Sequence, residues 1–99
     1  MINEVQRATI INLLKPVRPR KIGVFGSFAR GENKNESDLD ILIYLDHANK
    51  ISLLELIGAE QELSDALGIH VDLITERSLN PLIRPYIEKD LEIDRKSVV

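Results

Sequence analysis

The chain has 99 residues, of which 43% are hydrophobic, and its formal net charge at neutral pH is −3. This length supports one hydrophobic core and is too short for two, so we expect a single domain over residues 1–99. The absence of cysteine excludes disulfides, thiolate metal sites and a cysteine nucleophile. The small acidic excess disfavours binding to long DNA or RNA.

The N-terminal residues show no targeting signal. They lack a basic stretch followed by an apolar segment and a cleavage site, and no apolar run of the chain approaches the length of a membrane span. We therefore expect a cytoplasmic protein with no membrane partner.

The first elements in chain order are a helix, a strand and a loop. Asn3 and Gln6 resemble a capping pair ahead of an apolar stripe that ends before Pro16, which predicts a helix over residues 3–15. The run Lys-Ile-Gly-Val-Phe-Gly predicts a strand that ends at Gly26. The polar residues 29–37 that follow predict a loop.

A second strand, which carries two acids, and the elements after it complete an α-β-β-α-β-α order. Residues 38–45 are apolar on both faces apart from two acids, which is typical of an interior strand. A capping box at Ser52 predicts a helix that stops at Gly68. A third strand over residues 69–75 and a closing helix over residues 81–89 follow. This order predicts an α/β (α+β) fold.

Three aspartates in two predicted strands are the candidates for chemistry. Asp38 and Asp40 are two residues apart, so in a strand their carboxylates point to one face, about 7 Å apart along the backbone. Asp72 stands within the apolar run Val-Asp-Leu-Ile, where an unpaired acid is costly to desolvate. If the two strands are neighbours, the three carboxylates can hold Mg²⁺ against a phosphorylated substrate. The alternative for Asp72 is a solvent-facing strand end.

Gly26 and Ser27 directly follow the first strand and suit a phosphate-binding turn. Glycine lets the backbone turn sharply and bring amide donors close to phosphate oxygens, and Ser27 adds a hydroxyl donor. Arg30 can reach a phosphate with its guanidinium, although a solvated role in the loop is equally open. The sequence contains no Walker motif and no three-glycine dinucleotide pattern.

Gly26-Ser27, followed after ten residues by Asp38-x-Asp40, resembles the signature of the DNA polymerase beta-type nucleotidyltransferase superfamily. The fuller strings Val-Phe-Gly-Ser-Phe-Ala-Arg-Gly and Ser-Asp-Leu-Asp-Ile-Leu-Ile are most similar to the minimal nucleotidyltransferases, the antitoxins of MNT/HEPN toxin–antitoxin pairs. The resemblance spans about residues 21–75 and implies a nucleotidyltransferase fold, with a small mixed central sheet flanked by helices.

The resemblance also implies roles for these residues. Asp38 and Asp40 would bind two Mg²⁺ ions, Asp72 would bind the catalytic ion and help to deprotonate the acceptor hydroxyl, and Gly26-Ser27 would hold the phosphates of the NTP. Similar minimal domains transfer AMP from ATP to a tyrosine of a partner HEPN ribonuclease and so silence it, which implies an antitoxin here. The acceptor-binding domain of larger relatives is missing, so a second copy of the chain or a partner protein would supply it.

Two other functions fit the same residues. One is a toxin-binding module that retains the fold without catalysis, and the other is nucleotidyl transfer to a small molecule such as an aminoglycoside. The sequence leaves open the nucleotide base, the acceptor atom and the oligomeric state.

Some polar residues near the acids allow more than one interpretation. His70 shares a face with Asp72 and allows a transition-metal site or a proton shuttle, but a histidine at the start of a strand more often has no such role. For Asp46 and His47 a turn is favoured over ligation, and for Tyr44 core packing is favoured.

Overall fold

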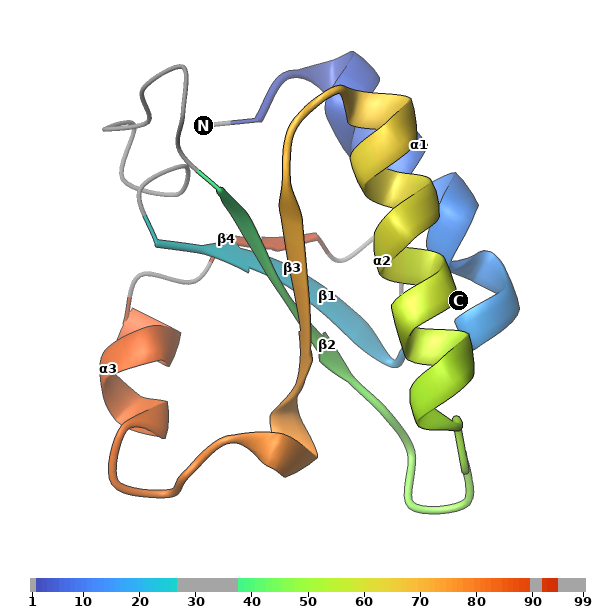
Figure 1. Cartoon of the computed structure of the whole chain (residues 1–99). Helices are drawn as coiled ribbons and strands as arrows, with labels where there is room; N and C mark the ends of the chain where they lie inside the picture. Colours follow the sequence, from blue (N-terminus) through green and yellow to red (C-terminus); the bar gives the residue numbers. More distant parts are fainter. Residues whose placement is uncertain (1, 27–37, 90–91, 95–99) are drawn as a thin grey trace.

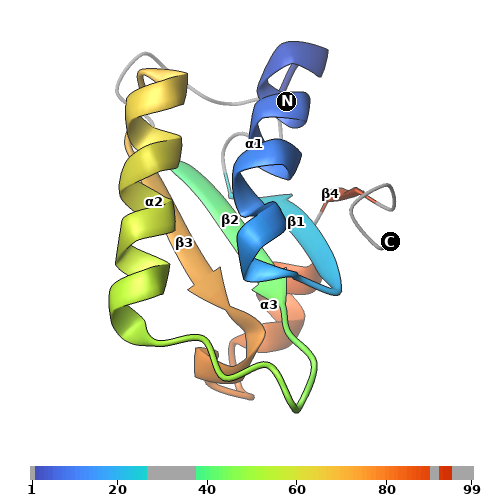
Figure 2. The ribbon, with the colours of Figure 1, turned by 90° about the vertical axis from the view of Figure 1, so that its right-hand side faces the viewer.

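The computed structural model describes residues 2–26 and 38–89, together with the backbone of residues 92–94. Two helices, α1 (Glu4–Leu14) and α2 (Leu53–Leu67), lie on one face of a sheet, and the short helix α3 (Arg84–Lys89) lies on the other (Figures 1 and 2). Within the described part of the chain, no helix is long and apolar enough to cross a membrane.

In the part of the chain that the structure describes, the sheet has four strands in the order β3-β2-β1-β4. The strands are β1 (Lys21–Phe25), β2 (Leu39–Tyr44), β3 (Val71–Thr75) and β4 (Glu92–Asp94). β1 pairs antiparallel with β2 and β4, whereas β2 pairs parallel with β3. The fold is therefore α/β with a mixed sheet, as predicted, and β2 is an interior strand.

Both long helices begin where their capping residues predict. The Asn3 side chain accepts a hydrogen bond from the Gln6 backbone N–H at 2.8 Å, and the Gln6 side chain accepts one from the Asn3 N–H at 2.9 Å. The Ser52 hydroxyl accepts from the Glu55 N–H at 3.1 Å, and Gly68 ends α2 with a φ of 70°. Each cap satisfies backbone groups that the first or last helical turn leaves without partners.

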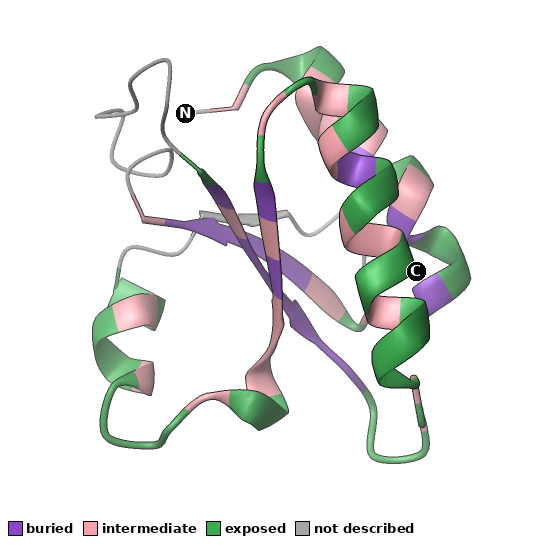
Figure 3. Cartoon of the chain, in the orientation of Figure 1, coloured by how far each residue is buried: buried purple, intermediate pink, exposed green. Residues whose placement is uncertain are grey.

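The hydrophobic core is divided between the two faces of the sheet. On the face of α1 and α2, alternate strand residues such as Ile41 and Ile43 pack with helix residues such as Leu14 and Leu63. On the opposite face, a smaller cluster contains Phe25, Leu42 and Tyr44, with Ile74, Leu79 and Ile87 packed against it. Figure 3 shows the buried residues concentrated along β1 and β2.

The C-terminal part of the chain contains the predicted closing helix but departs from the prediction at two points. The sequence predicted a helix over residues 81–89, but α3 begins only at Arg84, after a turn in which the Asn80 side chain accepts from the Leu82 N–H at 2.9 Å. Pro85 explains the later start, because proline fits the first turn of a helix but not its interior. The predicted order also ended with this helix and omitted β4, which is three residues long and gives no periodic signal.

Candidate active site

The candidate site lies at the edge of the sheet where β1 ends and where β2 and β3 begin. Phe25 of β1 pairs with Asp40 of β2, and Asp40 in turn pairs with Asp72 of β3. The parallel pairing of β2 and β3 brings both acidic segments to the same edge. The predicted neighbourhood of the two acidic strands is therefore confirmed.

The acids lie on the face of the sheet that α3 covers. Side chains alternate along a strand, so Asp40 shares a face with Leu42 and Tyr44, which belong to the smaller apolar cluster. Asp38 lies one residue before β2, not inside it as predicted. Its side chain is 50% exposed and that of Asp72 is 44% exposed, so both carboxylates reach solvent.

The three carboxylates repel one another. Burial raises the pKa of Asp40, and the negative charges of Asp72 and then Asp38 raise it further. Asp40 also shares a side-chain hydrogen bond with Asp72, which acts in the same direction on this pKa. A cation between the carboxylates would reverse the effect of the repulsion, because it favours their charged forms.

Gly26 closes the site from the end of β1. Its φ is 74°, a conformation that residues with a side chain rarely adopt, and a Cβ at this position would collide with Oδ2 of Asp40. The sequence predicted a sharp turn at Gly26, and the structure adds a second reason for glycine there. Ser27 and Arg30, the other predicted nucleotide-binding residues, lie outside the described residues, as does the predicted loop over residues 29–37.

His70 lies among the acids. Its Nδ1 is 3.3 Å from Oδ1 of Asp38 and 4.0 Å from Oδ1 of Asp72. The sequence showed that His70 and Asp72 share a face but favoured a histidine without a role in the site. What brings His70 to Asp38 is the register of the parallel strands, which the sequence does not give.

Helix α2 holds the backbone on both sides of Asp72. The Val71 N–H donates to the Ser64 hydroxyl at 3.0 Å, and the Leu73 N–H donates to Oε2 of Glu60 at 2.8 Å. Among the described strands β3 is at the edge of the sheet, so these N–H groups have no described strand on that side. Glu60 and Ser64 thus fix the strand that carries Asp72. No motif in the sequence indicated either residue, because the bonds arise only when α2 packs against β3.

The other polar residues considered from the sequence lie away from the acids. The Tyr44 hydroxyl donates to Oε2 of Glu88 at 2.8 Å on the α3 side of the sheet. Asp46 follows the far end of β2, where its carboxylate is 3.8 Å from Nε of Arg20, and His47 is exposed beside it. The structure therefore agrees with a packing role for Tyr44 and a turn role for Asp46.

The donor set suits a divalent cation. One ligand atom each from Asp38, His70 and Asp72 lies within 4.8 Å of the others, and Asp40 adjoins Asp72 across the strand pair. Carboxylate oxygens are the ligands that Mg²⁺ prefers in proteins, and substrate phosphates and water commonly complete its coordination. The residues present therefore fit the metal that the sequence resemblance implies.

The family model for the nucleotidyltransferase domain matches residues 8–98. The chain belongs to this family. MJ1217 of Methanocaldococcus jannaschii, named as a candidate protein adenylyltransferase, is 48% identical over 91 residues, which are 91% of each chain.

Two solved structures share the fold. A chain in a crystal structure of a toxin–antitoxin with AMP-PNP superposes with a TM-score of 0.78 at 26% identity, over 93% of this nucleotidyltransferase and 72% of that chain. A chain from a complex of a tri-AMPylated Shewanella oneidensis HEPN toxin with an MNT antitoxin gives a TM-score of 0.73 at 22% identity, over 93% and 71% of the two chains.

Proposed function

We propose that this nucleotidyltransferase transfers AMP from ATP to a hydroxyl group of a partner protein, an HEPN-type toxin, and thereby acts as its antitoxin in the cytoplasm. The observation that carries the proposal is the convergence of Asp38, Asp40 and Asp72 beside Gly26 at one edge of the sheet. The name of the relative MJ1217 and the toxin–antitoxin structures with the same fold support the choice of reaction and partner.

In this reaction the hydroxyl oxygen of the acceptor forms a bond to the α-phosphorus of ATP. The bond between that phosphorus and the bridging oxygen of the β-phosphate breaks, and pyrophosphate leaves with the electron pair. The hydroxyl proton passes to a carboxylate, for which we propose Asp72, because it is partly exposed and stands on an edge strand.

The aspartates would hold two Mg²⁺ ions, which when bound neutralise the phosphates and orient them for in-line displacement. The chain contributes the position of the carboxylates. Asp40 is fixed between β1 and β3, and Asp72 is fixed by the hydrogen bonds that its neighbours Val71 and Leu73 donate from their backbone N–H groups to Ser64 and Glu60. Gly26 leaves space for the Asp40 carboxylate, and we propose that Gly26, Ser27 and Arg30 bind the triphosphate.

The test is label transfer to a purified HEPN-type protein encoded beside this chain. With Mg²⁺, ATP labelled at the α-phosphate should label the partner, whereas ATP labelled at the γ-phosphate should not. The variant Asp38→Asn/Asp40→Asn should not transfer label. Asp46→Asn makes the same chemical change at the far end of β2 and should behave like the parent.

Two results would overturn the proposal. Transfer of γ-label would indicate a kinase, and equal transfer by the parent and the Asp38→Asn/Asp40→Asn variant would remove the acids from the mechanism. If that variant still silenced the toxin in cells as well as the parent does, antitoxin action would rest on contact and not on AMP transfer.

A further inference from the structure

His70 adds a nitrogen ligand to a site otherwise made of carboxylates. Leu39 of β2 pairs with Val71 of β3, so the residues just before them, Asp38 and His70, stand at equivalent positions. The Leu39 N–H donates to the His70 carbonyl at 2.9 Å and fixes this alignment. His70, just before β3, and Asp72 within it thus lie on the same face of the sheet as Asp38, just before β2, and Asp40 within it.

The imidazole is placed for shared coordination with two of the acids. The distances from Nδ1 of His70 are 3.3 Å to Oδ1 of Asp38 and 4.0 Å to Oδ1 of Asp72, separations that one cation could span. The His70 side chain is 64% exposed, so an ion has access to it from solvent. Among the described residues, this histidine and two aspartates form the group whose ligand atoms can meet at one ion.

We propose that His70 is an ion ligand that makes this site prefer first-row transition-metal ions, such as Co²⁺ and Mn²⁺, over Mg²⁺. Imidazole nitrogen binds transition ions well, whereas Mg²⁺ strongly favours oxygen. Asp38 and Asp72 supply oxygen to either class of ion, and His70 supplies the discrimination. The inference deepens the proposed function, since it concerns the same ion site.

A different role for His70 predicts the opposite change in ion affinity when the imidazole is removed. If the imidazole only forms an ion pair with Asp38, it competes with any cation for that carboxylate. Removal of His70 would then strengthen the binding of Mg²⁺ and Co²⁺ together. If His70 is a ligand, its removal weakens Co²⁺ binding and leaves Mg²⁺ binding unchanged.

The experiment titrates the full chain with Co²⁺ at one fixed pH, without nucleotide or partner, and follows the visible absorption of the bound ion. Isothermal titration gives the Mg²⁺ affinity of the same proteins. The variants are His70→Ala and His70→Gln. His47→Ala is the matched control, because His47 is the other of the two histidines and lies beyond the opposite end of β2.

We expect both His70 variants to bind Co²⁺ at least about tenfold more weakly, with the absorption bands shifted, while their Mg²⁺ affinity stays that of the parent. His47→Ala should match the parent for both ions. Co²⁺ affinity that is unchanged in the His70 variants, or that changes by the same factor as Mg²⁺ affinity, would overturn the inference.

The outcome is separable from that of the proposed function. If the His70 variants lose the preference for Co²⁺ but the parent transfers no α-label with Mg²⁺, this inference stands and the proposed AMP transfer is rejected. Label transfer by the parent, together with unaltered ion selectivity in the His70 variants, does the reverse.

Discussion

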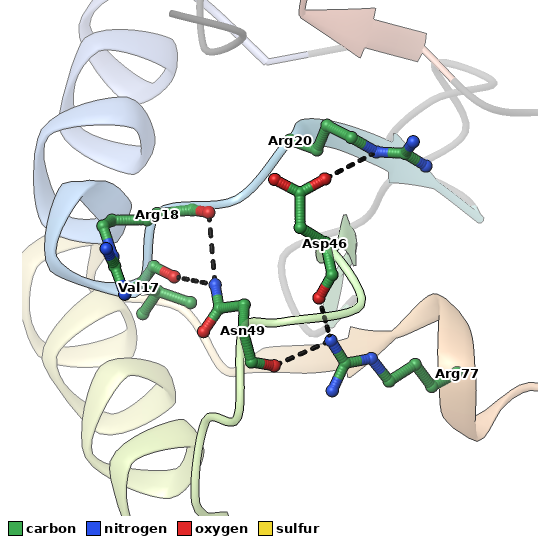
Figure 4. Close-up of polar contacts among 6 residues, drawn as sticks. All are labelled: Val17, Arg18, Arg20, Asp46, Asn49 and Arg77. Carbon is green, nitrogen blue, oxygen red and sulfur yellow. Dashed lines mark hydrogen bonds and ion pairs between the residues drawn. The ribbon is translucent and has the colours of Figure 1, made fainter.

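Strand β2 has carboxylates near both of its ends, and the two ends surround them differently. Where β2 begins, Asp38, Asp40 and Asp72 lie together, and their mutual repulsion raises the pKa of Asp40 beyond the effect of burial. Beyond the end of β2, Asp46 faces the cation of Arg20, and the Arg77 guanidinium donates to the backbone carbonyls of Asp46 and Asn49 (Figure 4).

The far end of β2 is a structural connection, which we call the Asn49–Arg77 clamp. The Asn49 side chain donates to the Val17 carbonyl at 2.8 Å and to the Arg18 carbonyl at 3.3 Å, and Arg77 holds the same loop from η2 (Glu76–Ser78) (Figure 4). The charged side chains there have partners within the chain: Asp46 faces Arg20, and Arg77 donates to backbone carbonyls. The acids at the other end are only partly compensated, which favours stability at one end of β2 and binding of a cation at the other.

The sharpest way to break this comparison is to remove the central charge of the acidic end. Asp40→Asn should lower AMP transfer by about two orders of magnitude or more, because Asp40 is one of the ion ligands that we propose and such a ligand contributes several kcal/mol to the transition state. The same change should leave the melting temperature unchanged or raise it, because it relieves repulsion. Transfer kinetics and calorimetry check the two effects, and a lower melting temperature with intact transfer would contradict the contrast.

Glycine substitutions separate backbone strain from collision in the acidic end. Gly26→Ala should destabilise the fold by about 1–3 kcal/mol, because the residue must adopt a positive φ and its Cβ meets the Asp40 carboxylate. Gly68→Ala carries the positive φ without a collision, and Gly58→Ala carries neither. The free energy of unfolding measured by urea denaturation should therefore be lowest for Gly26→Ala, intermediate for Gly68→Ala and highest for Gly58→Ala.

Of these three variants, Gly26→Ala alone should also reduce AMP transfer when the rate is corrected for the folded fraction. Equal transfer rates in all three would show that the Asp40 carboxylate tolerates displacement, and would remove Gly26 from the site.

Substitution in the Asn49–Arg77 clamp should lower the stability of the fold without lowering the rate of AMP transfer. Arg77→Met keeps much of the apolar stem and removes both hydrogen bonds, so it should destabilise the fold by about 1–2 kcal/mol. AMP transfer by the folded protein should stay at the parental rate, because the clamp does not contact Asp38, Asp40 or Asp72. Urea denaturation and transfer kinetics on the same samples make the comparison, and a loss of transfer would show that the two ends are coupled.

The bonds from α2 to β3 test how firmly Asp72 must be held. Glu60→Ala leaves the Leu73 N–H without its acceptor and should cost about 1 kcal/mol of stability, with a smaller loss of transfer than Asp40→Asn. Glu60→Gln retains a side-chain oxygen and should restore most of both. If Glu60→Gln and Glu60→Ala behave alike, the hydrogen bond does not position Asp72.

Much of the architecture could be predicted because local signals carry it. The caps at Asn3, Ser52 and Gly68 set helix ends through their own side chains or backbone freedom. The spacing of Asp38 and Asp40 placed them on one face without knowledge of the sheet. The single-domain organisation and the catalytic and nucleotide-binding roles of the site residues stay predictions.

What escaped the sequence depends on pairing between distant segments. β4 exists because it pairs with the free edge of β1, and its own residues include two acids with poor strand propensity. The contact of His70 with Asp38 follows from the register of β2 and β3, and the Glu60 bond follows from the packing of α2. The late start of α3 was readable, since Pro85 stands in the sequence, but the Asn-Pro pair before it gave a competing signal.

Tyr44 provides the mildest test, because it carries the polar contact between the sheet and α3. Burial first, and then the hydrogen bond to Glu88, raise the pKa of Tyr44 to about 12. A phenol with a pKa raised on folding contributes stability that is complete below its unfolded value of about 10 and is lost as the pH rises toward 12.

Tyr44→Phe should cost about 0.5–1.5 kcal/mol near neutral pH and should flatten the alkaline decline of stability, because phenylalanine has no proton to lose. The same hydrogen bond lowers the pKa of Glu88, so the variant should bring that pKa back toward its ordinary value. Urea denaturation between about pH 7 and 11, with the parent as reference, measures both the loss of stability near neutral pH and the slope of the alkaline decline. A parallel decline in parent and variant would assign the alkaline sensitivity to another group and leave α3 held by the apolar contacts of its Ile87 with the cluster of Phe25, Leu42 and Tyr44.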